Sequence, residues 1–218
     1  AGAFSDGKYN ITNDFGGTLH EYIGKKRAVE LMEYVDTINM QHGGAGTKMY
    51  STAGTHFKKL CLQNQLNLLD ASVRHLGTDI NFVVLQNLFG ELKDKVDFYF
   101  DTPVTGIALA EGGYRVLCGE AVYTCEKCIV SVGRSGSKWM EKICRELEIP
   151  TRSNRVDIGV RVELPAVIFS HLTDELYESK IVYRTSKFED RVRTFCMNPY
   201  GIVVNENTNG IVTVKGHS

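Results

Sequence analysis

Apolar residues recur along this chain in two different periods, and the period changes midway. In the first part they return about every three to four positions, which is the spacing of one face of a helix. This spacing predicts helices over 21–41, 55–63 and 79–93, with short strands over 66–69 and 72–76. The glycines at 43 and 44 are expected to end the first helix, because glycine readily adopts the left-handed conformation found there.

From residue 96 onward the shorter period of β-strands takes over. Strands are expected over 96–100, 104–110, 114–118 and 121–123. Residues 128–132 form a nearly all-apolar run, which is typical of a strand buried on both faces in a parallel sheet. A helix over 137–147 is expected to stop before Pro150.

Beyond residue 151 the pattern is mainly that of strands. They are expected over 156–163, 180–185, 191–196, 200–205 and 211–215. A helix over 165–177 interrupts them, and the Asn-Gly pair at 209–210 predicts a turn between the last two strands. We therefore expect a mixed α+β and α/β fold with two domains, 1–150 and 151–218.

The composition is that of an ordinary soluble protein, with 43% hydrophobic and 23% charged residues and a formal net charge of −1. Because the charge is balanced and contains no block of Lys or Arg, no nucleic-acid partner is predicted. No stretch approaches the roughly 18 consecutive apolar residues that a membrane span requires, so no membrane partner is expected either.

The chain has six cysteines in apolar or strand-like surroundings. This placement favours free thiols in a reducing compartment, and we expect a cytoplasmic protein. Cys125 and Cys128 form a CxxC motif without the second pair that a zinc site needs. If residues 121–132 are extended, these two side chains face opposite sides of a sheet, where they neither bridge nor share an ion. No metal site is therefore predicted.

The N-terminal segment 2–8 is dense in glycine and polar residues, as in a turn beside a strand or helix. It has the glycine and lysine spacing of a phosphate-binding P-loop, but Tyr9 stands where that motif needs Ser or Thr. Nucleotide triphosphate hydrolysis is therefore not predicted. Backbone N–H groups in such a turn could bind an anionic or carbonyl group of a cofactor. The alternative is a solvated tail. Since no strand leads into the turn, we expect the chain to be part of a longer protein.

Two further turns carry candidate ligand contacts. His75 and Asp79 flank a turn between a strand and a helix, where His75 would face a ligand and Asp79 or Thr78 would cap the helix. A structural role for His75 is the alternative. Gly133 and Arg134 follow the apolar run at a position where α/β sheets bind ligands, and Arg134 could contact phosphate or ribityl oxygens. A helix-entry turn with Arg134 in water is the alternative.

Six segments, in order, resemble a family of bacterial FAD-dependent dehydrogenases of largely uncharacterised substrate, the NAD(FAD)-utilising dehydrogenases. Members read GAGxFSDGK, HxGTD, a hydrophobic strand ending in GR, DxGVRVE, FCxNPxG and NGHS. The corresponding segments here are 2–8, 75–79, 132–134, 157–163, 195–201 and 215–218. Three positions depart from the expected residues: Ser131 and Val132 replace the Ala and Thr of flavoprotein strand ends, and Lys215 replaces the usual Asn.

The resemblance implies the later part of a flavoprotein Rossmann-type FAD domain within 1–150, with a helical insert and a β-meander. Residues 151–218 would form an inserted, mostly antiparallel substrate-side domain. FAD is the implied cofactor, and NAD(P)H is a candidate electron donor or acceptor. The family's GxGxxG unit would lie upstream, since this sequence contains none. Without that unit we expect these residues to bind FAD weakly or not at all.

The resemblance also implies roles for individual residues. The cofactor-binding residues would be Gly2, Ala3, Phe4, Ser5, Asp6, Gly7, Lys8, Val104, Gly133 and Arg134. His75 and Asp79 would face a small-molecule substrate. The expected function is that of a fragment of an FAD-dependent oxidoreductase that moves a hydride between flavin and this substrate. The alternative is a non-enzymatic α+β binding module whose glycine clusters are turns. A flavoprotein that modifies RNA is disfavoured by the neutral charge.

Overall fold

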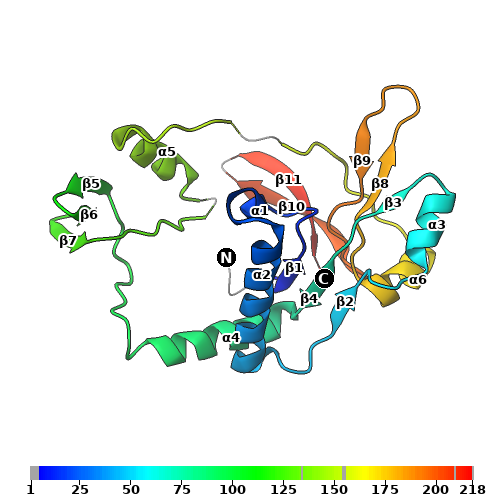
Figure 1. Cartoon of the computed structure of the whole chain (residues 1–218), viewed down its shortest axis with the longest axis horizontal. Coiled ribbons are helices and arrows are strands. Elements are labelled where there is room, and N and C mark those ends of the chain that lie inside the picture. The colour runs from blue at the N-terminus through cyan, green and yellow to red at the C-terminus, as the bar shows by residue number, and fades with distance from the viewer. Residues whose placement is uncertain (1–4, 134, 154–155, 209, 218) are drawn as a thin grey trace. The chain divides into compact units, whose positions relative to one another are not determined.

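The computed structural model describes residues 5–133, 135–153, 156–208 and 210–217 of the chain. The chain divides into two compact units. The first unit combines Ala1–Lys95 with Val160–Ser218, and the second is Val96–Gly159, so the predicted boundary at residue 150 lies inside the second unit. The secondary structure is mixed α+β with small antiparallel sheets (Figure 1).

A three-stranded antiparallel sheet in the order β1-β4-β2 lies in the first unit. Strand β1 spans Lys8–Ile11, β4 spans Ser72–His75 and β2 spans Met49–Ser51. The central strand buries Val73, a β-branched residue that suits a pleated surface. Lys8 lies opposite His75 in the register of β1 and β4. Two segments that the sequence singled out separately are therefore direct neighbours.

The helices of the first unit are α1 (Leu19–Ile23), α2 (Lys25–Asn39), η2 (Met40–Gly44), α3 (Phe57–Gln63), α4 (Gly77–Leu92) and α6 (Ala166–Leu176). The helix predicted over 21–41 is divided at Gly24, whose φ of 81° interrupts it. Gly43, with a φ of 119°, ends the helical run where the sequence predicted. Helix α4 begins at Gly77, and no side-chain hydrogen bond caps its described N-terminus, so the prediction that Thr78 or Asp79 caps it was wrong.

A buried apolar cluster fixes the position of α6. Phe57 and Cys61 of α3, Leu68 of the short strand β3 (Asn67–Leu68), and Leu172 and Leu176 of α6 pack together. Strand β3 pairs with β8 (Ile181–Arg184), which pairs with β9 (Arg191–Arg193), and Figure 1 shows α3 and α6 beside this sheet. The cluster therefore anchors the end of α6, which the candidate site immediately follows.

The chain of the first unit closes with an antiparallel hairpin of β10 (Ile202–Thr208) and β11 (Ile211–His217). Gly210 has a φ of 82°, and its N–H donates to Oδ1 of Asn207 at 3.0 Å. This confirms the turn that was predicted between the last two strands.

The second unit contains the predicted meander, with β5 (Gly106–Ala110), β6 (Gly113–Cys118) and β7 (Ala121–Cys125), and the helix α5 (Ser137–Glu146). Three predicted strands were wrong, because 96–100, 128–132 and 156–163 pair with no strand among the described residues. Ile129 is 93% exposed and Ile158 95% exposed. A parallel strand needs hydrogen-bonding neighbours, and the sheets described here are antiparallel.

Within the part of the chain that the structure describes, no helix combines the length and the apolar character that crossing a membrane would require.

Candidate functional site

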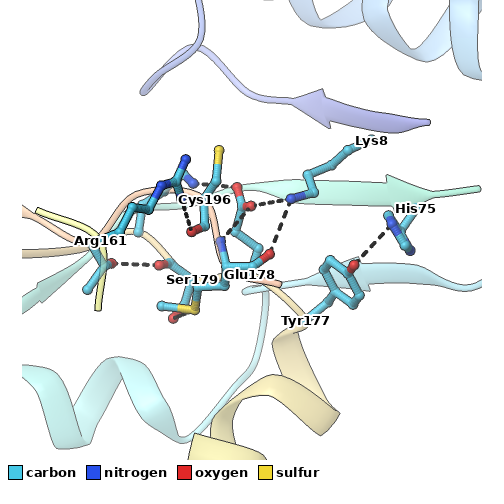
Figure 2. A network of polar contacts seen from close by, with 10 residues as sticks. Lys8, His75, Arg161, Tyr177, Glu178, Ser179 and Cys196 are labelled. Carbon is cyan, nitrogen blue, oxygen red and sulfur yellow. Dashed lines mark hydrogen bonds and ion pairs between the residues drawn. The ribbon is translucent and has the colours of Figure 1, made fainter. Parts of the chain in front are cut away.

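A buried ion-pair network lies where β1 meets the residues that follow α6 (Figure 2). We call it the Lys8–Glu178 network, and its members are Lys8, Glu178 and Lys180. Nζ of Lys8 donates to Oε2 of Glu178 at 2.7 Å, and Nζ of Lys180 donates to Oε1 of the same carboxylate. The carboxylate side chain is 1% exposed, and the two lysine side chains are 12% and 4% exposed. Burial raises the pKa of Glu178, but the two ammonium groups outweigh burial and the pKa lies below its ordinary value.

The residue before Glu178 has an unusual backbone. Tyr177 has a φ of 56° and a ψ of −62°, and the N–H of Glu178 donates to the carbonyl of Leu176 at 2.6 Å. These values describe a γ-turn of the rare, strained kind, which an L-residue adopts only when its surroundings hold it there. The turn directs the Tyr177 ring toward β4 (Figure 2).

Tyr177 and His75 form a stacked pair. The phenol oxygen lies 3.0 Å from Nε2 of His75, and the ring centroids are 4.2 Å apart at an interplanar angle of 28°. Nζ of Lys8 lies 5.5 Å from the centroid of the Tyr177 ring, within the range of a cation–π contact. The pair is therefore held by β4, by the γ-turn and by the neighbouring ammonium group.

The surroundings set the protonation states of the pair. Burial lowers the pKa of His75, and the charge of Lys8 lowers it further, against the opposite effects of Asp6 and Glu178. Burial raises the pKa of Tyr177 to about 12, and the carboxylates of Asp6 and Glu178 add to the increase. At neutral pH His75 is therefore an uncharged imidazole and Tyr177 a protonated phenol. Such a pair can accept a proton at the imidazole.

Segments that are distant in the sequence meet at the network. The carbonyl of Met197 accepts a hydrogen bond from Lys8 at 3.4 Å, and the N–H of Met197 donates to Glu178 at 3.3 Å. Nη1 of Arg161 donates to the carbonyl of Cys196 at 3.5 Å (Figure 2). Residues from four of the six family-like segments therefore lie in one neighbourhood of the first unit: Lys8, His75, Arg161, and Cys196 with Met197.

The glycine that precedes β1 is required by packing. Gly7 has a φ of 59°, and a Cβ atom there would lie 2.8 Å from Cβ of Asn81 and 2.9 Å from Cβ of Leu76. Asn81, which is buried in α4, accepts a hydrogen bond from Tyr9 at 3.0 Å and donates to Ser5 at 3.4 Å. The start of β1 is therefore fastened to the first turns of α4.

The structure brings together only some of the predicted site residues. Ser5, Asp6, Gly7, Lys8 and His75 are close in the first unit. Asp79 is exposed in the first turn of α4. In the second unit, Val104 precedes β5 and Gly133, with a φ of 65°, precedes α5. Gly2, Ala3, Phe4 and Arg134 lie outside the described residues.

Tyr177, Glu178 and Lys180 were not predicted as site residues. Tyr177 is the last residue of the predicted helix 165–177, Lys180 is the first of the predicted strand 180–185, and Glu178 lies in the connection between them, where charged and polar residues are usually solvated. Their removal from water depends on the packing of α6, and no local sequence pattern predicts it. Among the described residues, no group of three or more His, Cys, Asp or Glu side chains is placed to hold a metal ion.

Comparison with protein-family models finds no match to this chain, and no solved structure matches it. An uncharacterised protein of Clostridium beijerinckii is 28% identical to the chain over 145 residues. The similarity covers 61% of this chain and 27% of the length of that protein.

Proposed function

We propose that this chain is part of an FAD-dependent oxidoreductase in which the His75–Tyr177 pair handles a proton of a small-molecule substrate. The proposal rests on the meeting of residues from four family-like segments, Lys8, His75, Arg161 and Met197, in the neighbourhood of the Lys8–Glu178 network. Segments that served only as independent turns would have no reason to bring these residues together around one buried ion pair. The strained backbone at Tyr177 adds support, since such strain tends to occur at functional sites.

The described residues do not by themselves fit the phosphates of FAD. The ammonium of Lys8 is directed at Glu178 and at the carbonyl of Met197. The space beside Gly7 is filled by Leu76 and Asn81, so the absence of a side chain there is explained by packing and not by room for a phosphate. We therefore propose that FAD is bound chiefly by a Rossmann-type domain of a longer protein, through a GxGxxG unit that this sequence does not contain. Contacts of Ser5 and Asp6 with FAD stay a prediction.

His75 and Tyr177 have different roles in this proposal. The neutral imidazole of His75 accepts the substrate proton, since a base with a pKa below neutrality is available in its unprotonated form. Tyr177, whose pKa is about 12, is a weak acid and positions the imidazole by stacking and hydrogen bonding. FAD, when bound, would supply the hydride transfer.

The test compares the longest natural open reading frame that contains these residues with the 218-residue chain. Both products are purified by gel filtration, and their flavin absorbance is recorded. We expect about one flavin per molecule of the longer product, and none retained by the shorter chain. A longer product without flavin would overturn the proposal and favour the non-enzymatic binding module.

A variant pair then tests the role of His75 in the longer product. His75→Gln should keep the flavin but slow its reduction or reoxidation by the substrate about a hundredfold or more. Glu33→Gln, an exposed change on α2, should leave both flavin content and turnover unchanged. If His75→Gln turns over as fast as the parent, His75 is not the proton acceptor.

A further inference from the structure

The sheet of β3, β8 and β9 carries arginines on the face that is turned away from α3 and α6. Ile181 of β8 packs against the buried cluster of those helices. Because side chains alternate between the two faces of a strand, Arg184 lies on the opposite face from Ile181. Arg191 of β9 is directly opposite Arg184 in the register and shares its face. Arg193 is two positions from Arg191 and lies on this face as well. We call Arg184, Arg191 and Arg193 the arginine face.

The arginine face places two like charges directly opposite each other. Cβ atoms of such a pair are roughly 5 Å apart, and like charges at this spacing destabilise a sheet. The side chains of Arg184 and Arg191 are exposed, and neither forms an ion pair with any carboxylate that the structure describes, including those of Glu189 and Asp190 in the connecting turn. Nη1 of Arg184 donates to the carbonyl of Glu189 at 3.5 Å, which leaves its charge uncompensated. An anion from outside the chain would supply the missing counter-charge.

Two phenylalanine rings hold one end of this face in place. The guanidinium carbon of Arg193 lies 5.3 Å from the centroid of the Phe195 ring and 5.9 Å from that of the Phe15 ring. Nζ of Lys180 lies 5.2 Å from the Phe195 centroid and 5.4 Å from the Phe15 centroid. These contacts restrict the Arg193 side chain without removing its charge. Less side-chain freedom is therefore lost when Arg193 binds a ligand.

We propose that the arginine face binds a small molecule that carries a diphosphate group. The planar guanidinium group can donate two parallel hydrogen bonds to the oxygens of one phosphoryl group. Arg191 and Arg193 are two positions apart on β9, which is roughly 7 Å along a strand. Two linked phosphoryl groups can therefore engage the Arg184–Arg191 pair and Arg193 together, whereas a single phosphate serves one position. This site is independent of the proposed oxidoreductase function, in which the pyrophosphate of FAD is held by a GxGxxG unit.

The test is a calorimetric titration of the 218-residue chain with sodium diphosphate at low ionic strength, where charges are little screened. We expect saturable binding of one diphosphate per chain, and inorganic phosphate should bind at least about tenfold more weakly. ADP that binds as tightly as diphosphate would support the diphosphate group as the whole determinant. Tighter binding of ADP would support a nucleotide as its source. The proposal is overturned if diphosphate shows no saturable binding, or if inorganic phosphate binds equally well.

Variants then locate the bound anion. Arg184→Gln and Arg191→Gln should each weaken diphosphate binding by about tenfold or more. Arg191→Lys should recover only part of that loss, because it restores the charge without the planar fork. Lys187→Gln is the matched control, since it removes a charge from the exposed turn of the same hairpin, and it should weaken binding by less than about twofold. Equal weakening in the three glutamine variants would show that only net charge matters, which overturns the proposal.

A stability measurement without ligand separates lost binding from lost folding. Arg191→Gln relieves the repulsion from Arg184, so the midpoint of its urea denaturation should equal or exceed that of the parent. A lowered midpoint would show that the charge of Arg191 is already compensated within the chain, and the arginine face would then have no need of an external anion.

Discussion

Nζ of Lys8 lies 2.7 Å from Oε2 of Glu178, although 170 positions separate the two residues in the sequence. The contact joins the first strand of the chain to the residues that follow α6, and both side chains are largely removed from water. Because Glu178 also holds Lys180, one carboxylate neutralises part of two buried positive charges. The stability of the first unit should therefore depend on this carboxylate.

Glu178→Gln should destabilise the chain by about 3 kcal/mol, because it leaves two buried ammonium groups without a counter-charge. The free energy of unfolding is measured by urea denaturation of the parent and the variant. Glu33→Gln, which changes an exposed residue of α2, should alter it by less than about 0.5 kcal/mol. Equal losses in the two variants would show that the buried pairs contribute nothing of their own.

The same variant gives a prediction for the stability of the chain at acidic pH. The pKa of Glu178 is lower in the folded chain than in the unfolded chain, so the unfolded state binds more protons as the pH falls. The stability that this group contributes is complete above the ordinary glutamate pKa and is lost as the pH falls through the lower, folded value. Urea denaturation at a series of acidic pH values should therefore show a shallower decline for Glu178→Gln than for the parent. If the stabilities of the parent and the variant decline in parallel, the pKa of Glu178 is not lowered in the folded chain.

Lys8→Met should raise the pKa of His75, because it removes a positive charge that disfavours the imidazolium. The pKa is read from the pH dependence of the imidazole signals in NMR spectra, with His75→Gln used for assignment. Lys26→Met, on a residue whose side chain is 93% exposed, should leave the His75 pKa in place. In the parent, the depressed pKa also means that stability rises with pH between the folded value and the ordinary value of about 6.5.

The elements that the sequence predicted well are those with local signals. The meander of β5, β6 and β7 follows from alternating apolar residues, and the final hairpin follows from the turn before Gly210. The strand predicted over 128–132 is wrong for the opposite reason, since its formation depends on distant parts of the chain. An apolar run is compatible with a buried strand, but only neighbouring strands can bury it, and they are not set by the run itself.

The candidate site was predicted in pieces and not as an arrangement. Lys8 and His75 were each identified, one for the cofactor and one for the substrate, and their pairing in adjacent strands appeared only in the fold. Tyr177 and Glu178 were missed because their burial depends on α6 packing against α3. Local sequence reports a turn or a helix, whereas desolvation of a charged residue is a tertiary property.

Gly7→Ala and Gly77→Ala should separate steric exclusion from backbone strain. Both glycines have positive φ, but a Cβ atom on Gly7 would meet Asn81 and Leu76 below 3.0 Å, whereas one on Gly77 would meet nothing within 4 Å. We expect Gly77→Ala to cost about 1 kcal/mol and Gly7→Ala at least about 2 kcal/mol more. Urea denaturation gives both values. If the two costs are equal, the close packing of Gly7 on α4 is not required.

The strain at Tyr177 can be measured by comparing the stabilities of two variants, Tyr177→Gly and Tyr177→Ala. We expect the usual order, in which alanine is the more stable residue, to be reversed at this position. At most positions glycine is less stable than alanine by about 0.5–1 kcal/mol, because glycine has more freedom to lose on folding. At a φ of 56° and a ψ of −62° a Cβ atom is disfavoured, so Tyr177→Gly should be more stable than Tyr177→Ala by about 1 kcal/mol. Both variants lose the ring, so the loss of stacking on His75 cancels in the comparison.

Tyr183, an exposed residue of the strand β8, supplies the matched control, because Tyr183→Gly should be less stable than Tyr183→Ala there. The difference of each pair is taken from urea denaturation under the same conditions. Tyr177→Phe completes the set: it keeps the ring and the backbone but removes the hydroxyl group, and should cost about 1 kcal/mol for the lost hydrogen bond to His75. Should glycine be the less stable residue at both positions, Tyr177 is unstrained, and the γ-turn no longer supports a functional role for the pair.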